Sequence, residues 1–381
     1  MNPRNVIIWG GLAAFLVIVF FEARIVAQNL EVKDLSAYWA AAQLMEDNPY
    51  SAEKVQGLKQ ESGITNSPTL IMRNPPWTLV ILFPLRWLDY FSTFALWTML
   101  NVFVVSTCAL VVWNLRGGNN PIWALLISMF FGPTLLLLRH GQIAGLVLLG
   151  YVGFLVCVEK ERDWVAGIFL FFVFLKPHLA LPFLLVLLFW SVRTRRYAVI
   201  VTCALCVVVA SILVVSINPL IFSQYRSLFH EAPVWSTVYP NLGGILAWIT
   251  GRQWVSFLLF LGGCAWSFYY WLSMRKIWSW KSHLPIILLV SLVTSYYSYG
   301  YDEVIVLPAL LRAALKGGKK TVTVALMIVT LVMLACATEW VNAYAFGYML
   351  NSWTATAWLL VYMISNRKKS LPPKINLSAY V

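Results

Sequence analysis

The feature that most constrains this chain is a succession of long apolar runs separated by short polar or Pro/Gly breaks. A helix of about 20 apolar residues crosses the hydrocarbon layer, which is about 30 Å thick, and pairs its own backbone groups there. Hydrophobic residues fill 60% of the 381 positions and charged residues only 11%, against about 45–50% and about 25% in soluble domains. The composition excludes a water-soluble globule and predicts an all-α polytopic membrane protein.

The apolar runs predict a single integral-membrane domain over residues 1–381, with about twelve membrane-crossing helices. A first extracytoplasmic loop covers residues 27–90, and residues 366–381 form a cytoplasmic tail. Several of the runs are shorter than a full span, and we expect them to tilt or to lie where the bilayer thins. The predicted helices are 5–26, 91–113, 121–138, 141–158, 164–175, 178–190, 197–217, 254–274, 284–297, 303–315, 321–338 and 344–364.

The topology depends on the short apolar run at residues 76–88, which is too short to span and contains Pro84 near its end. If this run lies on the membrane surface, both termini are cytoplasmic, and most of the 28 Lys and Arg residues lie on the inside. If it crosses, a basic cluster such as Arg193–Arg196 moves outside. We therefore expect a multi-pass protein of the cell membrane, with its unusual polar residues on the extracytoplasmic side.

The net charge of +13 follows from this distribution of cations. It indicates membrane lipids, and not nucleic acid, as the partner of the basic segments. The chain contains neither GxxxxGK[ST] nor GxGxxG, and it has no HExxH or paired Cys/His set. We therefore expect no metal and no other cofactor.

Asp34 precedes a stretch, residues 35–45, whose apolar positions recur with helical spacing. The stretch is interpreted as an amphipathic interfacial helix of the first loop, with Leu35, Tyr38, Trp39, Ala42 and Met45 on one face. Asp34 has two interpretations, which are compatible: it caps this helix, since Asp is a favoured N-cap, or it is a carboxylate held at the membrane surface, or it does both. In the second interpretation it is a general base for a hydroxyl group.

Two breaks in the apolar pattern carry cations, namely Arg139-His140-Gly141-Gln142 and Lys176-Pro177-His178. A lysine inside hydrocarbon is costly, so Lys176 faces a polar cavity or extends its ammonium to the membrane surface. If Lys176, His178, Arg139 and His140 lie on one side, they suit a phosphate group. Arg73 similarly suits either a lipid headgroup or a bound phosphate.

The segment Ser298–Glu303 places two acids next to the start of a predicted helix. The helix dipole accounts for one acid there, but two acids at membrane depth are harder to explain as structure. Asp302 and the nearby Tyr299 are therefore candidate substrate-binding residues.

Together these motifs resemble glycosyltransferase family 87, a member of the GT-C superfamily of polyprenyl-phosphate-sugar-dependent enzymes. The likeness covers about residues 5–315 and lies in the order and spacing of the motifs. The motifs are Asp34 with Tyr38, Ala42 and Asn48-Pro49-Tyr50; Pro75-Pro76; Pro84-Leu85; Gly141-Gln142; Lys176-Pro177; and Ser298…Tyr301-Asp302 ahead of Leu307-Pro308.

The resemblance implies a GT-C-type bundle in which Asp34 is the catalytic base and Lys176 faces the phosphate of the carrier lipid. The family includes mycobacterial mannosyltransferases that extend phosphatidylinositol mannosides, so mannose is the favoured sugar. Actinobacterial members tend to have Ser-aromatic-Asp-His-His before the late helix, whereas this chain has Tyr301-Asp302 and lacks the histidines. This departure concerns the acceptor and the sugar more than the reaction type.

We therefore predict an inverting glycosyltransferase that moves a hexose from a polyprenyl-phosphate carrier to a lipid or glycan hydroxyl on the extracytoplasmic face. The alternatives are a transporter or flippase of a lipid-linked glycan and a non-catalytic membrane scaffold. A transporter of this kind is expected to have two repeated halves, and the sequence contains no convincing repeat. A scaffold would leave the presence of Lys176 in an apolar run unexplained. The predicted substrate-binding residues are Arg73, Arg139, His140, Gln142, Lys176, His178, Tyr299 and Asp302.

Overall fold

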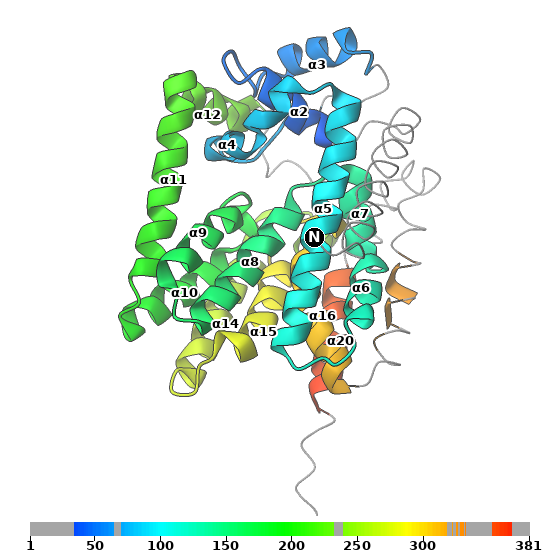
Figure 1. Ribbon diagram of the computed structural model, residues 1–381, viewed down its shortest axis with the longest axis vertical. Helices are drawn as coiled ribbons and strands as arrows, with labels where there is room; N and C mark the ends of the chain where they lie inside the picture. The colour runs from blue at the N-terminus through cyan, green and yellow to red at the C-terminus, as the bar shows by residue number, and fades with distance from the viewer. Residues whose placement is uncertain are drawn as a thin grey trace, which may run out of the picture.

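The computed structural model describes residues 34–64, 70–231, 239–317 and 353–367, with a few positions between 322 and 332. All regular secondary structure in these residues is helical, which confirms the predicted all-α class. Figure 1 shows two parts: a bundle of apolar helices and, across one end of it, a layer of short helices.

The layer of short helices is built from the polar loop that precedes the long α5, together with one later helix. Its members are α2 (Leu35–Gln43), α3 (Ala52–Glu61), η1 (Pro76–Thr78), α4 (Leu79–Leu82), η2 (Phe83–Trp87) and α12 (Ile221–Glu231). α2 packs on α3, α4 and η2, and α12 packs on η1. Residues 76–88 are thus three short helical turns within this layer and do not form one span.

The bundle is formed by the apolar helices, whose ends fall at the polar breaks in the sequence. They are α5 (Tyr90–Leu115), α6 (Pro121–Met129), α7 (Gly132–His140), α8 (Ala144–Glu159), α9 (Asp163–Val173), α10 (Leu181–Thr194), α11 (Ala198–Ile217), α13 (Leu242–Thr250), α14 (Trp254–Met274), α15 (Trp280–Val293), α16 (Leu307–Gly317) and α20 (Thr354–Arg367). Two 3-10 segments, η3 (Pro177–Leu179) and η5 (Gly300–Val306), lie at breaks between them.

Three described helices, α5, α11 and α14, are long and apolar enough to cross a membrane. A fourth crossing is added if α6 and α7, which meet at a bend of 59°, count as one broken span. α8, α9, α10 and α15 are apolar but have only 10–17 residues, so α9 with 11 residues is about 16 Å long. The predicted helix 5–26 lies outside the described residues, as does most of the predicted pair 321–338 and 344–364.

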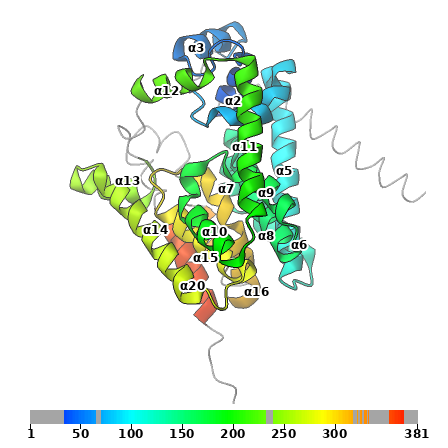
Figure 2. The same ribbon diagram turned by 90° about the vertical axis from the view of Figure 1, so that its left-hand side faces the viewer.

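Small residues let the central helices approach closely. α8 packs along α9, and α9 packs along α11. A Cβ at Gly153 would lie 2.1 Å from the Phe169 ring, and one at Gly167 would lie 2.6 Å from the Val199 carbonyl oxygen. Glycine at such contacts is typical of helix packing in membranes. Figure 2 shows α11 standing upright beside α9 and reaching from the bundle into the layer of short helices.

The basic connections gather at the end of the bundle opposite to that layer. The guanidinium of Arg196, which precedes α11, donates to the Asp163 carboxylate at the start of α9. Arg116, which follows α5, donates to the carbonyl oxygen of Lys281 in the first turn of α15. In Figure 1 the lower ends of α5, α10, α14 and α20 share this end of the molecule. We call it the basic end.

α2 forms where it was predicted, but it is not an amphipathic surface helix. All eight residues from Leu35 to Ala42 are buried. The face expected to be solvated is covered by α3, α4, η2 and α5, with the Trp39 indole donating to the Leu88 carbonyl oxygen. The run of alanines after Trp39 makes this enclosure possible, because small side chains let neighbouring elements approach from every side.

Candidate active site

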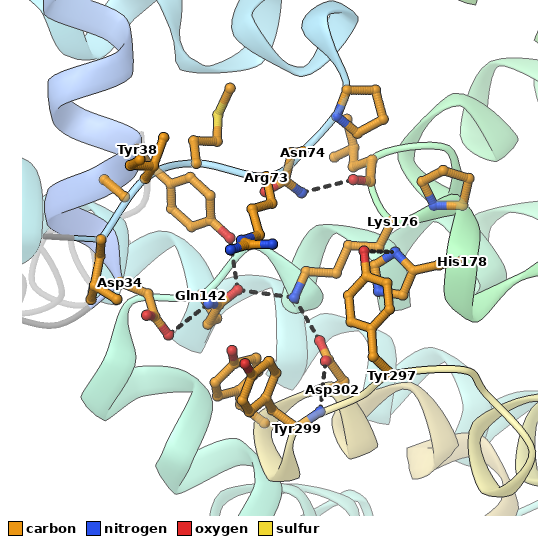
Figure 3. Close-up of a pocket in the computed structure, with 18 of the residues that line it drawn as sticks. Asp34, Tyr38, Arg73, Asn74, Gln142, Lys176, His178, Tyr297, Tyr299 and Asp302 are labelled. Carbon is orange, nitrogen blue, oxygen red and sulfur yellow. Dashed lines mark hydrogen bonds and ion pairs between the residues drawn. The ribbon is translucent and has the colours of Figure 1, made fainter. Parts of the chain in front are cut away.

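Four polar side chains from distant parts of the chain meet beneath the layer of short helices (Figure 3). Asp34 stands before α2, and Gln142 lies in the break between α7 and α8. Lys176 lies between α9 and η3, and Asp302 lies within η5. Asp34, Gln142 and Lys176 lie just outside helices, and Asp302 lies in a short 3-10 segment, so each stands at a break in the regular helices of the bundle.

A continuous chain of hydrogen bonds joins these four residues. The Gln142 amide nitrogen donates to Oδ2 of Asp34 at 2.7 Å. The Lys176 ammonium donates to the Gln142 amide oxygen at 3.0 Å and to Oδ1 of Asp302 at 2.6 Å. Gln142 therefore couples a carboxylate on one side to an ammonium on the other.

These residues line a cavity of about 320 Å³ at the junction of the layer and the bundle. Of the predicted site residues, Asp34, Arg73, Gln142, Lys176, His178, Tyr299 and Asp302 line it. Tyrosines form much of the remaining wall, namely Tyr38, Tyr225, Tyr297 and Tyr301. The cavity thus combines charged groups with aromatic faces and hydroxyls, a combination suited to a polar ligand with a ring.

Asp34 does not cap α2 with its side chain. Its backbone is already helical, and its carboxylate makes no hydrogen bond to the first turn of the helix. The carboxylate instead meets Gln142 and lies 3.5 Å from Nδ1 of His140. Both contacts are made by Oδ2, and the Asp34 side chain keeps 23% of its surface exposed. The Asp34 side chain therefore faces the cavity and makes no cap hydrogen bond to α2.

The surroundings of Asp34 favour its charged form. Burial by itself would raise the pKa of the carboxyl group, but the hydrogen bonds from His140 and Gln142 and the positive charge of Lys176 outweigh it. The pKa of Asp34 is consequently lowered below its ordinary value of 3.8. Asp34 is therefore a carboxylate at neutral pH and can accept a proton.

Lys176 is held inside the protein and does not extend to the surface. Only 6% of the residue is exposed, and its ammonium also lies 5.0 Å from the centre of the Tyr301 ring. Asp302, 1% exposed, is fixed from behind by the Tyr299 backbone N–H, which donates to its second oxygen at 3.0 Å. A buried ion pair of this kind persists only when further hydrogen bonds satisfy both partners.

Arg73 enters the cavity from the loop between α3 and η1, and Figure 3 shows its side chain pointing toward Gln142. The loop is anchored on the end of α9. The Asn74 side-chain amide donates to the Leu175 carbonyl oxygen at 2.8 Å, and the Trp77 indole donates to that of Phe174 at 2.9 Å. These two bonds use carbonyls that the end of the helix leaves without partners.

The predicted cluster of four cations is divided in the structure. Lys176 and His178 line the cavity, whereas His140 stands behind Asp34 against Tyr301 and Arg139 lies outside the lining. Gly141 produces this arrangement, because it ends α7 in the left-handed conformation, with φ 62°. The chain then turns so that Gln142, and not Arg139, faces the cavity.

His178 pairs with a tyrosine that sequence reasoning missed. Its Nδ1 lies 2.8 Å from the Tyr297 hydroxyl, and the two rings stack with centres 3.8 Å apart. Tyr38, Tyr225 and Asn74 were also not selected as site residues. Tyr38 donates to the Gln142 amide oxygen at 2.7 Å, whereas the sequence used it only as a sign of helical periodicity and as part of the family resemblance.

Within the described ranges, no three His, Cys, Asp or Glu side chains come together in a way that could hold a metal ion. The two acids at the cavity, Asp34 and Asp302, are bound by an amide and an ammonium group, respectively.

Comparison with known proteins gives one match. The sequence model of glycosyltransferase family 87 matches residues 73–296, which is more than half of the chain and includes Gln142 and Lys176. The comparisons with curated proteins and with solved structures found no match.

Proposed function

The chain belongs to glycosyltransferase family 87, and from this premise we propose that it is an inverting, polyprenyl-phosphate-sugar-dependent enzyme. It transfers a hexose, with mannose favoured, to a hydroxyl group of a lipid or glycan acceptor. The observation that carries the proposal is the hydrogen-bonded chain from Asp34 through Gln142 to Lys176, because it places a base and a cation at one cavity.

Asp34 is the proposed general base. Of the two carboxylates at the cavity, Asp302 has both oxygens occupied, by the Lys176 ammonium and by the Tyr299 backbone N–H. Among the described residues, the contacts of the Asp34 carboxylate fall on Oδ2 alone, which leaves Oδ1 to accept the proton of an acceptor hydroxyl. Proton removal by a positioned carboxylate typically contributes about 10²–10⁴ in rate.

Lys176 is the proposed ligand of the carrier phosphate. An ammonium group has three N–H donors, and two of them are used by Gln142 and Asp302. The third can meet a phosphate oxygen, with Arg73 reaching in from the opposite wall (Figure 3). Asp302 and Gln142 would then hold the ammonium in position without blocking it.

The reaction follows from these two roles. The acceptor hydroxyl gives its proton to Asp34, and its oxygen forms a bond to the anomeric carbon of the sugar. The bond from that carbon to the phosphate oxygen breaks on the opposite face, which inverts the configuration. The electron pair leaves with the polyprenyl phosphate, whose charge Lys176 and Arg73 stabilise. We expect no metal or other cofactor, since cationic side chains are placed to stabilise this leaving group.

A second cavity supports a lipid-linked donor. It has a volume of about 500 Å³ and shares His178 and Tyr297 with the polar cavity. Its other walls are mostly apolar, with Leu181, Trp254, Phe257, Phe260 and Tyr296. An isoprenoid chain in this cavity would place its phosphate beside His178, which is two residues from Lys176 in the sequence.

The position of the cavity supports an extracytoplasmic reaction. The lining of the cavity includes Arg73 and Tyr225 from the layer of short helices and its loops, and this layer crosses the end of the bundle opposite to the basic end (Figure 1). Under the positive-inside rule the basic end is cytoplasmic, so the cavity opens toward the outside of the cell membrane. We propose that a multi-pass GT-C-type bundle of about twelve spans holds it there.

The test is transfer of a radiolabelled sugar from polyprenyl-phosphate mannose, glucose or arabinose in membranes with and without the protein. We expect label in an extracted lipid or glycan with one donor only, mannose being favoured. A flippase would move the donor across vesicles and form no glycosidic product. That outcome would contradict the proposal.

A further inference from the structure

Two arginines from different helices meet at the basic end, far from the cavity. Arg116 directly follows α5, and Arg312 lies in α16. Arg116 donates through Nη2 to the Lys281 carbonyl oxygen at 2.5 Å, and Arg312 donates through Nη1 to the carbonyl oxygen of the next residue, Ser282. The first turn of α15 therefore brings two guanidinium groups side by side.

The charges of these two groups are not compensated by an acid in the described ranges. Neither arginine forms an ion pair there, whereas Arg196 at the same end is paired with Asp163. The negative charge of Glu159 acts on Arg116 only at a distance. The Nε atoms of both arginines are buried and find no acceptor in this part of the structure.

The charge of Arg312 also acts on Arg116. Burial, together with the charge of Arg312, lowers the pKa of Arg116 to about 10. Residues 307–321, which include Arg312, and residues 354–381 contain Lys and Arg but no Asp or Glu. An anion beside the two guanidinium groups would offset this like-charge interaction.

We infer that Arg116 and Arg312 bind the phosphate group of an anionic phospholipid in the leaflet at the basic end. Guanidinium groups bind phosphate oxygens through paired N–H donors. The site lies at the ends of α5, α15, α16 and α20, where basic pockets between helices bind lipid headgroups. The Tyr362 ring, 5.8 Å from the Arg312 guanidinium, suits the membrane interface. This inference does not depend on the proposed enzymatic function.

The experiment uses the full chain in phosphatidylcholine nanodiscs that contain increasing fractions of phosphatidylglycerol. Thermal stability and lipid retained in native mass spectra are measured at each fraction. For the wild type we expect a saturable rise in Tm and one retained phosphatidylglycerol. For Arg116→Gln/Arg312→Gln we expect the half-saturating fraction to increase about ten-fold or more, since each basic residue contributes about 1 kcal/mol to such binding.

The matched control is Arg193→Gln/Arg195→Gln, which removes the same charge from exposed positions at the same end. It should respond like the wild type. An equal increase of the half-saturating fraction in both double variants would show only general attraction to a charged surface, and it would overturn the site. An unchanged half-saturating fraction in the Arg116/Arg312 variant would overturn the site as well. If that variant does not fold, the single change Arg312→Gln carries the same comparison.

A last arm separates the two sources of phosphate. Soluble glycerol phosphate is added to protein in pure phosphatidylcholine. We expect no shift in Tm up to millimolar concentration, because a headgroup held in the leaflet has a far higher local concentration. A shift that Arg312→Gln abolishes would overturn the lipid as the ligand in favour of a free phosphate.

Discussion

At the scale of single residues, the two carboxylates of the cavity differ in what surrounds them. Asp302 is 1% exposed and bound on both oxygens, while the Asp34 side chain is 23% exposed and bound on one. The fully bound acid serves to hold Lys176, and the partly exposed acid can exchange a proton. This difference, and not the residue type, supports the two roles that we propose.

We predict that Asp34→Asn lowers the transfer rate by about 10²–10⁴ and leaves Tm nearly unchanged. The amide retains the size of the side chain, and its oxygen can still accept the hydrogen bond from Gln142. The substitution also removes no cap of α2, since the Asp34 side chain makes none. Initial rates with a labelled donor and thermal unfolding in detergent provide the measurements. An Asn variant within a few-fold of the wild-type rate would show that Asp34 is not the base.

The second prediction concerns the Lys176–Asp302 pair. Lys176→Met leaves a buried carboxylate without its partner and should cost about 3–5 kcal/mol of stability. Adding Asp302→Asn removes that charge, so the double variant should recover most of the Tm. Donor kcat/KM should remain about ten- to a hundred-fold below wild type in both variants. A double variant with wild-type donor kinetics would show that Lys176 does not bind the phosphate of the donor.

At the scale of elements, η5 is fixed against α20 by the residue after Asp302. The Glu303 carboxylate accepts hydrogen bonds from the Thr354 hydroxyl and, at 3.1 Å, from the Trp358 indole. Trp358 in turn packs on Phe131 at the bend between α6 and α7, with ring centres 5.1 Å apart. Three elements that are separate in sequence thus hold the segment that carries Asp302.

We predict that Thr354→Val destabilises the protein by about 1–3 kcal/mol, because it leaves a buried acceptor of Glu303 without its donor. Thr356, two residues later on α20, is the matched control. Its hydroxyl is buried and has no partner among the described residues, so Thr356→Val should be neutral or stabilising. The measurement is thermal unfolding of both variants under one condition. Equal Tm values would show that the hydrogen bond from Thr354 to Glu303 does not stabilise the contact between η5 and α20.

At the scale of the whole molecule, the helices alternate between a cavity end and a basic end. α8 leaves the cavity at Ala144 and ends at Glu159 near the basic loops, and α9 returns toward Lys176. This alternation predicts which loops an impermeant reagent can reach from outside the cell.

Cysteines placed at Gln60 and His230, both exposed in the layer of short helices, should react with an impermeant thiol reagent on intact cells. A cysteine at Lys276, exposed between α14 and α15, should react only after the cells are permeabilised. Labelling of all three on intact cells would contradict the proposed orientation. The unsubstituted protein, with its six native cysteines, gives the background.

Local features of the sequence were enough to predict the helical class, the positions of most helices and the residues worth attention. Apolar runs and Pro/Gly breaks act over a few residues, so they predicted helices such as α11 and α14 nearly to their bounds. They also marked Lys176 and Gln142 as exceptions to an apolar pattern. Burial of every face of α2 was not predictable in this way, because it depends on which distant elements pack around it.

The partners of each polar residue were decided by the tertiary structure alone. Gln142 meets Asp34 across 108 residues of sequence, and Lys176 meets Asp302 across 126. An apolar pattern states that a lysine needs a polar partner but not which one, since several acids and amides satisfy the same requirement. The choice was made by helix packing, together with the left-handed turn at Gly141. The sequence therefore determined which residues could not face lipid, and the packing of the helices determined which of them face one another.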